Sequence, residues 1–180
     1  MRILFAILLG GLIAGAFDIV YAIVAYGPLS YGVPAERVLQ SVAAGWIGRD
    51  AAQAGGMATA ALGLATHFFI ASVMAAVFVF AARRLRMLTQ NPWLWGFVYG
   101  LILYVVMNYI VAPLSAAGAN MHFAASLAEA GARVSEAFSE IRPRHDPNYP
   151  WFLAATLFTH TVLVGIPIAL VARRFALGDR

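Results

Sequence analysis

Four polar side chains lie deep inside otherwise apolar stretches, and they are the residues best placed to do chemistry: Asp18, His67, Asn108 and His160. Each is 13 to 17 residues from the arginine or asparagine that marks one end of its stretch. In a helix this spacing corresponds to about 20–26 Å. We therefore expect the four side chains to share one level of a membrane, one from each of four helices.

This predicted layer has a structural and a functional interpretation. In the structural one, Asp18 accepts a hydrogen bond from a histidine, and Asn108 and a nearby tyrosine complete the network; the candidate tyrosines are Tyr21, Tyr104 and Tyr109. In the functional one, the carboxylate and an imidazole form a site for a proton or a small solute, because ionisable groups inside a bilayer must face the bundle interior and find partners. We predict that Asp18 is coupled to at least one of the two histidines.

Cofactor ligation remains an alternative. Two histidines from two helices at one depth, His67 and His160, could hold a haem b through both imidazoles. The same histidines with Asp18 would form a 2-His-1-carboxylate set for a divalent metal. No motif specific to a cytochrome accompanies them, so the sequence predicts no cofactor, with haem b or a metal-dependent redox protein as the alternative.

Enzyme chemistry finds little support in the sequence. The chain has no cysteine and no lysine, which excludes thiolate nucleophiles and Schiff-base chemistry. It lacks a nucleophile elbow, an HExxH motif and a glycine-rich phosphate loop. The formal net charge of +4 is spread between apolar runs, which is typical of membrane orientation and not of nucleic-acid binding. We predict that the protein is not an enzyme and binds no nucleic acid.

The elements that must position these side chains are four membrane-spanning helices. The 180 residues are 62% hydrophobic and only 11% charged, which is far from the composition of a soluble domain. Long apolar runs cover 3–26, 57–82, 93–112 and 151–172, and each meets the length needed to cross a bilayer. The first run is too long for an ordinary signal peptide, so we expect a retained helix.

Arginine positions predict the orientation. Seven arginines follow or precede the spans on one side, in clusters such as Arg83-Arg84 and Arg173-Arg174, whereas five lie on the other side among most of the acidic residues. Under the positive-inside rule, both termini are cytoplasmic. The lipid bilayer is the expected partner, and a homo-oligomer or a membrane complex stays open.

Two amphipathic helices are predicted outside the membrane. Residues 34–48 place Val38, Val42 and Trp46 on one helical face. Residues 121–141 place Phe123, Leu127, Val134, Phe138 and Ile141 on an apolar face, opposite His122, Ser126, Glu129, Arg133, Glu136 and Glu140. We expect an amphipathic helix that lies on the outer leaflet or caps the bundle, with Glu129 and Arg133 as a favourable i,i+4 pair on its polar face.

The two halves of the chain carry the same features in the same order, within one membrane domain covering 1–180. Repeat one (1–86) and repeat two (91–176) each contain a GxxxG helix, a Pro-Leu-Ser exit, an outer helix, a Thr-His helix and a double arginine. Both halves begin and end on one side, which predicts two parallel helical hairpins in an all-α bundle. The motif glycines Gly11, Gly15, Gly96 and Gly100 suit close helix packing inside that bundle, with dimerisation as the alternative.

Several of these residues also carry a family resemblance. The Gly11–Gly15 opening, the Thr66-His67-Phe-Phe-Ile-Ala stretch, the Trp95-Gly96-xxx-Gly100 start and the Pro113-Leu114-Ser115 exit fit, as does a His160 helix that ends in Arg173-Arg174. In these features the chain resembles the YagU-like uncharacterised bacterial inner-membrane proteins. The resemblance implies a multi-pass protein of the bacterial inner membrane, of unknown role, and it transfers no site residues.

Overall fold

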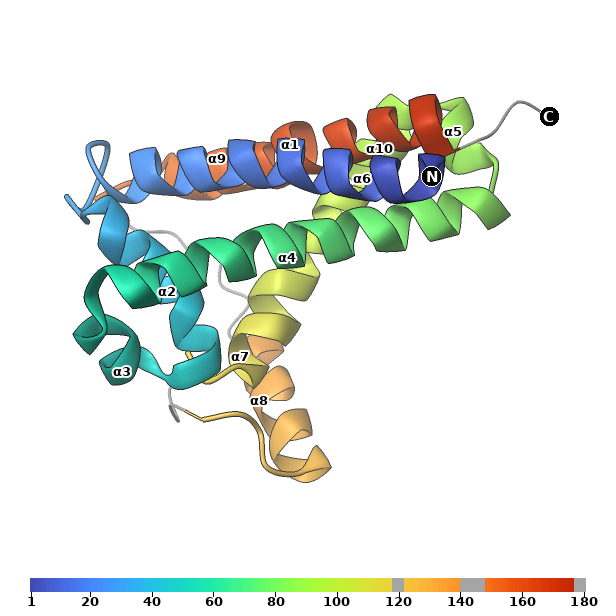
Figure 1. The fold of residues 1–180 in the computed structure, drawn as a ribbon. Helices are drawn as coiled ribbons and strands as arrows, with labels where there is room; N and C mark the ends of the chain where they lie inside the picture. The colour runs from blue at the N-terminus through green and yellow to red at the C-terminus, as the bar shows by residue number, and fades with distance from the viewer. Residues whose placement is uncertain (118–121, 140–147, 177–180) are drawn as a thin grey trace. The chain divides into compact units, whose positions relative to one another are not determined.

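A computed structural model describes residues 1–117, 122–139 and 148–176, and in this part of the chain the regular structure is entirely helical. Figure 1 shows the helices in chain order. They are α1 (Arg2–Tyr26), α2 (Ala35–Ile47), α3 (Arg49–Ala54), α4 (Gly56–Arg84), α5 (Met87–Gln90), α6 (Pro92–Val106), η1 (Met107–Val111), α7 (Ala112–Leu114), α8 (Leu127–Ser139), α9 (Phe152–Phe158), η2 (Thr159–Gly165), α10 (Ile166–Val171) and η3 (Ala172–Ala176).

Four helices in the described residues are long and apolar enough to cross a membrane, as the sequence predicts. They cover Arg2–Tyr26, Gly56–Arg84, Pro92–Leu114 and Phe152–Phe175. We refer to them as spans one to four; span three is continuous through α6, η1 and α7, and span four runs from α9 into η3. Their ends agree with the predicted apolar runs to within a few residues, because hydropathy alone decides where a chain can enter a bilayer.

The chain forms two compact units, and each takes residues from all four spans. Unit 1 contains Met1–Tyr21, His67–Tyr104 and Ala154–Arg180. Unit 2 contains Ala22–Thr66 and Val105–Leu153. The main apolar core lies in unit 1, where alanines allow close approach of the helices around Phe78 and Ile168. A smaller cluster in unit 2 joins α2 and α3 through Ala43, Ala44 and Ala52.

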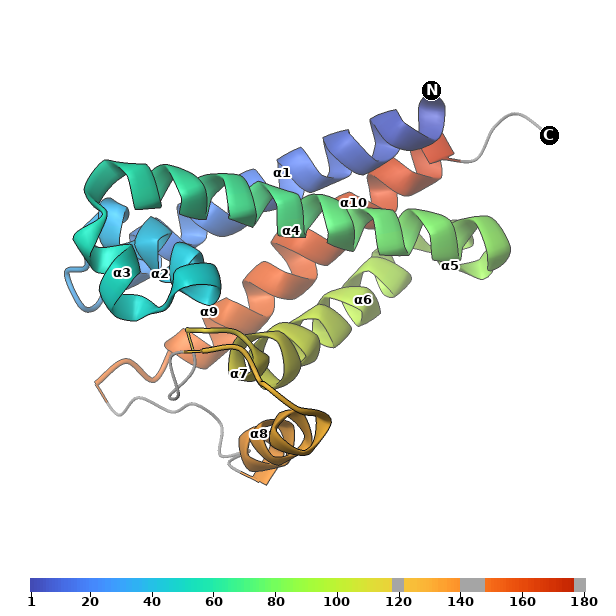
Figure 2. The same ribbon diagram turned by 60° about the horizontal axis from the view of Figure 1, so that its bottom comes forward.

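Small residues bring the spans of unit 1 into backbone contact. A Cβ added at Gly11 would lie 2.6 Å from Ser72 Cα, so α1 packs directly on α4. A Cβ at Gly96 would lie 2.7 Å from Ile166 Cα, and a Cβ at Gly100 would lie still closer to the His160 carbonyl oxygen and the Thr161 Cα. Figure 2 shows α6 beside the α9–α10 segment. All four motif glycines lie at helix contacts within one chain.

Spans three and four both widen into a π-helix just before a proline. Pro113 follows η1, and Pro167 follows η2. A proline ring has no N–H to donate and clashes with the carbonyl four residues earlier, and the i→i+5 pattern of a π-helix accommodates both effects. Pro167 lies inside the apolar run 151–172, and the structure shows the resulting interruption as a seven-residue π-helix that contains His160. Pro113 lies one residue before the end of span three.

The outer helices agree with the prediction in one case and correct it in the other. The helix predicted over 34–48 is α2, Ala35–Ile47. The helix predicted over 121–141 is shorter within the described residues, since α8 begins only at Leu127, and residues 121, 140 and 141 lie outside the described ranges. Ser126 ends the non-helical stretch, because its Oγ accepts a hydrogen bond from the Glu129 N–H at 3.2 Å.

The predicted polar face of α8 is also wrong at one position. Arg133, expected on the polar face, is buried at 8% exposure, whereas Leu127 on the apolar face is 94% exposed. The physical reason is a need for donors at the end of span three, whose last carbonyls have no intrahelical partner. The guanidinium of Arg133 meets that need, as the site geometry shows.

Candidate functional site: polar residues inside the spans

His67 is held by the backbone of the neighbouring helix. Its Nε2 lies 2.9 Å from the Gly15 carbonyl oxygen of α1. Because a carbonyl only accepts, Nε2 carries the hydrogen and donates it. The remaining ring nitrogen, Nδ1, has no hydrogen-bond partner among the described residues. The second glycine of the first GxxxG motif therefore both contacts α4 and orients this imidazole.

His160 is hydrogen-bonded to its own helix, and through the other ring nitrogen. Its Nδ1 lies 2.9 Å from the Thr156 carbonyl oxygen, so Nδ1 donates and Nε2 is left as the basic nitrogen. The Tyr104 ring from α6 meets the imidazole edge-on, with 5.6 Å between ring centroids. The π-helical turn around His160 makes this side chain part of an irregular, widened stretch of span four.

A hydrogen bond links this group to span one. The Tyr21 hydroxyl and the Thr156 hydroxyl are 3.0 Å apart, so Tyr21, Thr156, His160 and Tyr104 form one connected cluster in unit 1. Tyr21 and Tyr104 are two of the three tyrosines predicted to complete the polar layer. The third, Tyr109, stacks on Phe138 of α8 in unit 2, with ring centroids 5.2 Å apart.

Asp18 lies between two of the contacts that α1 makes in unit 1. It is one helical turn after Gly15, which meets His67, and one turn before Tyr21, which meets Thr156. At about 100° per residue, Asp18 falls about 60° from each of them around the helix axis. The residue is half-buried and forms no hydrogen bond or ion pair with any described residue. The predicted coupling of Asp18 to a histidine is therefore not present as a direct bond to the ring nitrogens.

Asn108 belongs to a different part of the molecule. It lies in η1 and in unit 2, whereas Asp18, His67 and His160 lie in unit 1. Within unit 1 the structure gathers Tyr21, Thr156, His160 and Tyr104, and pairs His67 with Gly15.

The donor geometry bears on the cofactor alternatives. The described residues hold no group of three His, Cys, Asp or Glu side chains that could bind a metal ion, so Asp18, His67 and His160 are not gathered into a 2-His-1-carboxylate set. His160 alone has the arrangement of an imidazole ligand, with one N–H on a carbonyl and the other nitrogen left over. His67 uses Nε2 on Gly15, which leaves only the more hindered Nδ1 beside Cβ. That hydrogen bond does not fit ligation of a haem iron through both Nε2 atoms.

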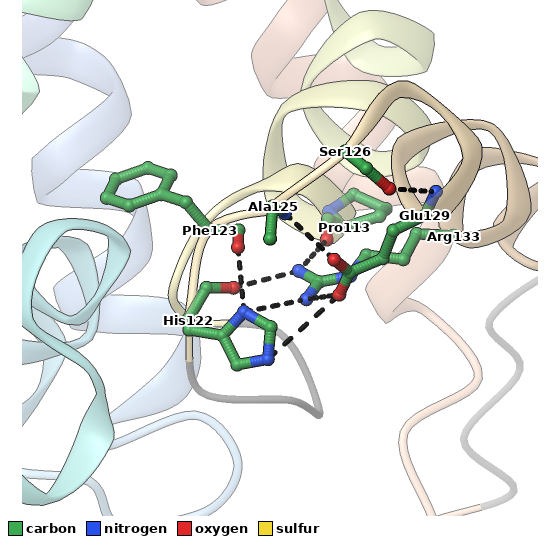
Figure 3. A network of polar contacts seen from close by, with 7 residues as sticks. All are labelled: Pro113, His122, Phe123, Ala125, Ser126, Glu129 and Arg133. Atoms are coloured by element: carbon green, nitrogen blue, oxygen red, sulfur yellow. Dashed lines mark hydrogen bonds and ion pairs between the residues drawn. The ribbon is translucent and has the colours of Figure 1, made fainter.

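A second polar network lies in unit 2, outside the predicted membrane layer (Figure 3). Arg133 donates from Nη1 to the carbonyl oxygens of His122 at 2.9 Å and Pro113 at 3.4 Å. Its Nη2 lies 2.5 Å from Glu129 Oε1, one turn earlier on α8. Pro113 is in the last turn of span three, so the guanidinium caps the carbonyl end of that helix, where a cation is favourable.

Glu129 completes this network from the other side. Its Oε2 accepts a hydrogen bond from the Ala125 N–H at 2.8 Å. This backbone hydrogen bond, and then the one from Arg133, lower the pKa of the Glu129 carboxyl below its usual value. His122 Nε2 lies 4.0 Å from the same carboxylate. The carboxylate therefore stays ionised at neutral pH and holds the start of α8 to the segment before it.

Sequence reasoning paired Glu129 with Arg133 at i,i+4 spacing but did not find the cap. The pair was visible as a helix-surface interaction, whereas the carbonyls of Pro113 and His122 come from another segment. It also missed the Trp46 indole N–H, which donates to the buried Thr66 hydroxyl at 3.0 Å. The Arg133 contacts join residues 20 and 11 positions apart and the Trp46 contact joins residues 20 positions apart, and periodicity within one helix carries no signal for them.

Comparisons with known proteins found no match. No family model matches this sequence, and neither a curated protein nor a solved structure matches it.

Proposed function

We propose that this protein is a multi-pass inner-membrane protein whose helical bundle holds a polar site for a proton or a small solute. The site consists of Asp18, His67 and His160, with the Tyr21, Thr156 and Tyr104 side chains around His160. One observation carries the proposal: each span histidine donates one N–H to a backbone carbonyl, which leaves a basic nitrogen inside an apolar span. Asp18 adds a carboxylate that has no partner in the described residues.

The energetic argument favours a functional role over a purely structural one. A carboxylate in the apolar part of a membrane is costly unless a partner neutralises it. A structural layer would supply that partner from the bundle itself, as it does for His67 through Gly15. At Asp18 no such partner is present among the described residues, so an exchangeable proton or solute is the better explanation.

We further propose that the bundle consists of two parallel repeats with both termini in the cytoplasm. The contacts of the GxxxG motifs support this. Gly11 and Gly15 meet α4 at positions 68–72, just after Thr66-His67. Gly96 and Gly100 meet span four at positions 160–166, beginning at Thr159-His160. In each half, the GxxxG helix thus packs on the same stretch of its Thr-His helix.

The experiment that tests the site measures thermal unfolding in detergent between about pH 5 and 8, the range in which histidine changes charge. The variants are Asp18→Asn, His160→Gln and Asp18→Asn combined with His67→Gln. We expect the wild-type unfolding temperature to bend with pH and the profiles of the variants to be flatter. Asp50→Asn, an exposed carboxylate in α3, is the matched control and should follow the wild type. Parallel profiles for all proteins would instead support a structural layer and contradict the proposal.

A further inference from the structure

The register between spans one and four locates Asp18 relative to the His160 cluster. The two helices are antiparallel, because Phe5 packs on Phe175 with ring centroids 5.1 Å apart and Tyr21 bonds Thr156. Figures 1 and 2 show the start of α1 beside the end of span four. Interpolating linearly between these two contacts pairs Asp18 with residues 159–160. His160 shares a helix face with Thr156, since it bonds the Thr156 carbonyl, so the Asp18 carboxylate and His160 lie at one level of unit 1.

Two acceptors at this level have no hydrogen-bond partner among the described residues. The carboxylate of Asp18 offers only lone pairs, and so does Nε2 of His160, because its Nδ1 holds the hydrogen. The Tyr21 and Thr156 hydroxyls bond one another, and Tyr104 meets the imidazole through its ring. A ligand between Asp18 and His160 must therefore donate hydrogen bonds, and an anion is excluded by charge.

Within the described part of unit 1, no arginine lies near Asp18 along the spans. In the described part of unit 1, the arginines lie in the first or last turns of the spans or in the connection before α6, as Arg2 and Arg83 illustrate. Arg2 is 16 residues from Asp18, which corresponds to about 24 Å of helix. An ion pair over such a distance contributes little. Within the described part of unit 1, the charge of the carboxylate therefore has no balancing cation.

We infer that the occupant is a small monocation with N–H donors, ammonium or a protonated primary amine, held between the Asp18 carboxylate and Nε2 of His160. This inference rests on the proposed function and gives the solute its chemical class. Each acceptor receives one hydrogen bond from the cation, and the positive charge neutralises the carboxylate within the apolar span.

The test compares cations that differ only in their N–H donors. Thermal unfolding of the full chain in detergent is measured at about pH 8, where histidine is neutral. Ammonium chloride and methylammonium chloride are compared with tetramethylammonium chloride at equal ionic strength. We expect the first two salts to raise the unfolding temperature by about 3 °C relative to the third, which carries charge but no N–H group.

The variants decide where the cation binds. Asp18→Asn and His160→Gln should each abolish the ammonium-dependent increase in the unfolding temperature. Each variant is a separate test, so if one cannot be purified, the other still tests the inference. Asp50→Asn and His122→Gln carry the same substitutions outside the spans and should retain it. An increment that survives in both Asp18→Asn and His160→Gln would overturn the inference.

The outcomes also separate this inference from the proposed function. If ammonium has no effect but the wild-type pH profile still bends and flattens in Asp18→Asn, a proton is the only occupant, and the inference fails alone. If neither ammonium nor pH distinguishes the wild type from Asp18→Asn, the inference and the proposed function fail together.

Discussion

At the scale of single residues, Arg133 is a charged side chain whose burial is explained by the hydrogen bonds that its guanidinium donates. It serves three acceptors: the Pro113 carbonyl at the end of span three, the His122 carbonyl, and the Glu129 carboxylate. Removing it takes the donor from two backbone carbonyls and leaves the carboxylate with the Ala125 N–H, and a neutral side chain cannot replace the lost charge-assisted bonds.

We therefore expect Arg133→Ala to lower the free energy of unfolding by about 2 kcal/mol, the usual cost of losing hydrogen bonds that involve a charged group. Arg49→Ala is the matched control, because the exposed Arg49 gives one hydrogen bond to the Ala117 carbonyl, at 3.0 Å. Its loss should cost under about 1 kcal/mol. Denaturant titration in detergent measures both, and equal losses would show that Arg133 is no cap.

Glu129 makes the attachment of α8 depend on pH. The Ala125 N–H and then Arg133 lower its pKa in the folded state, so the ionised carboxylate stabilises the fold above its unfolded pKa. That contribution is lost as the pH falls through the lowered folded pKa, below the ordinary glutamate value of about 4.3. We expect Glu129→Gln to be less stable than the wild type at neutral pH and to converge with it on acidification. A constant difference across the acid range would contradict this linkage.

At the scale of elements, glycine spacing and proline position decide how the spans pack. Gly100 brings span three against the backbone at His160, and the π-helix before Pro167 contains the same histidine. The orientation of His160 thus depends on two features that hydropathy does not distinguish from ordinary apolar helix. π-helical turns often occur at functional sites, and here the turn carries the one basic ring nitrogen beside Tyr104.

Gly100→Ala should destabilise the bundle by at least about 2 kcal/mol, because its Cβ would overlap the His160 carbonyl and the Thr161 Cα. The matched control is Gly131→Ala in α8, where an added Cβ meets nothing within 4 Å. That change should be neutral or stabilise the helix by up to about 1 kcal/mol. Thermal unfolding in detergent compares the two, and a Gly100→Ala protein as stable as Gly131→Ala would show that the spans do not approach as described.

At the scale of the whole molecule, four apolar helices and an uneven arginine distribution predict the topology. Single cysteines can report it, because the chain has none of its own. We expect Asp50→Cys to react with a membrane-impermeant thiol reagent in intact cells and Gln90→Cys to react only after lysis. Both positions are exposed, at α3 and at the end of α5. Labelling of Gln90→Cys alone in intact cells would reverse the orientation.

The sequence by itself determined the apolar elements and which polar residues lie inside them. Span positions follow from hydropathy, since a bilayer accepts only long apolar helices, and the prediction therefore agrees with the structure at all four spans. The polar set Asp18, His67 and His160 follows from the same argument, because each is an exception within an apolar run. Such information is local, and one sequence is enough to contain it.

Only the tertiary structure decided what those polar residues contact. It assigned His67 to the Gly15 carbonyl, His160 to its own helix and Arg133 to the end of span three. These partners are mostly backbone carbonyls, which every residue carries, so no residue type or spacing identifies them in advance. The π-helices and the late start of α8 depend likewise on which carbonyls find donors, and hydrogen-bond satisfaction is settled only when the helices have packed.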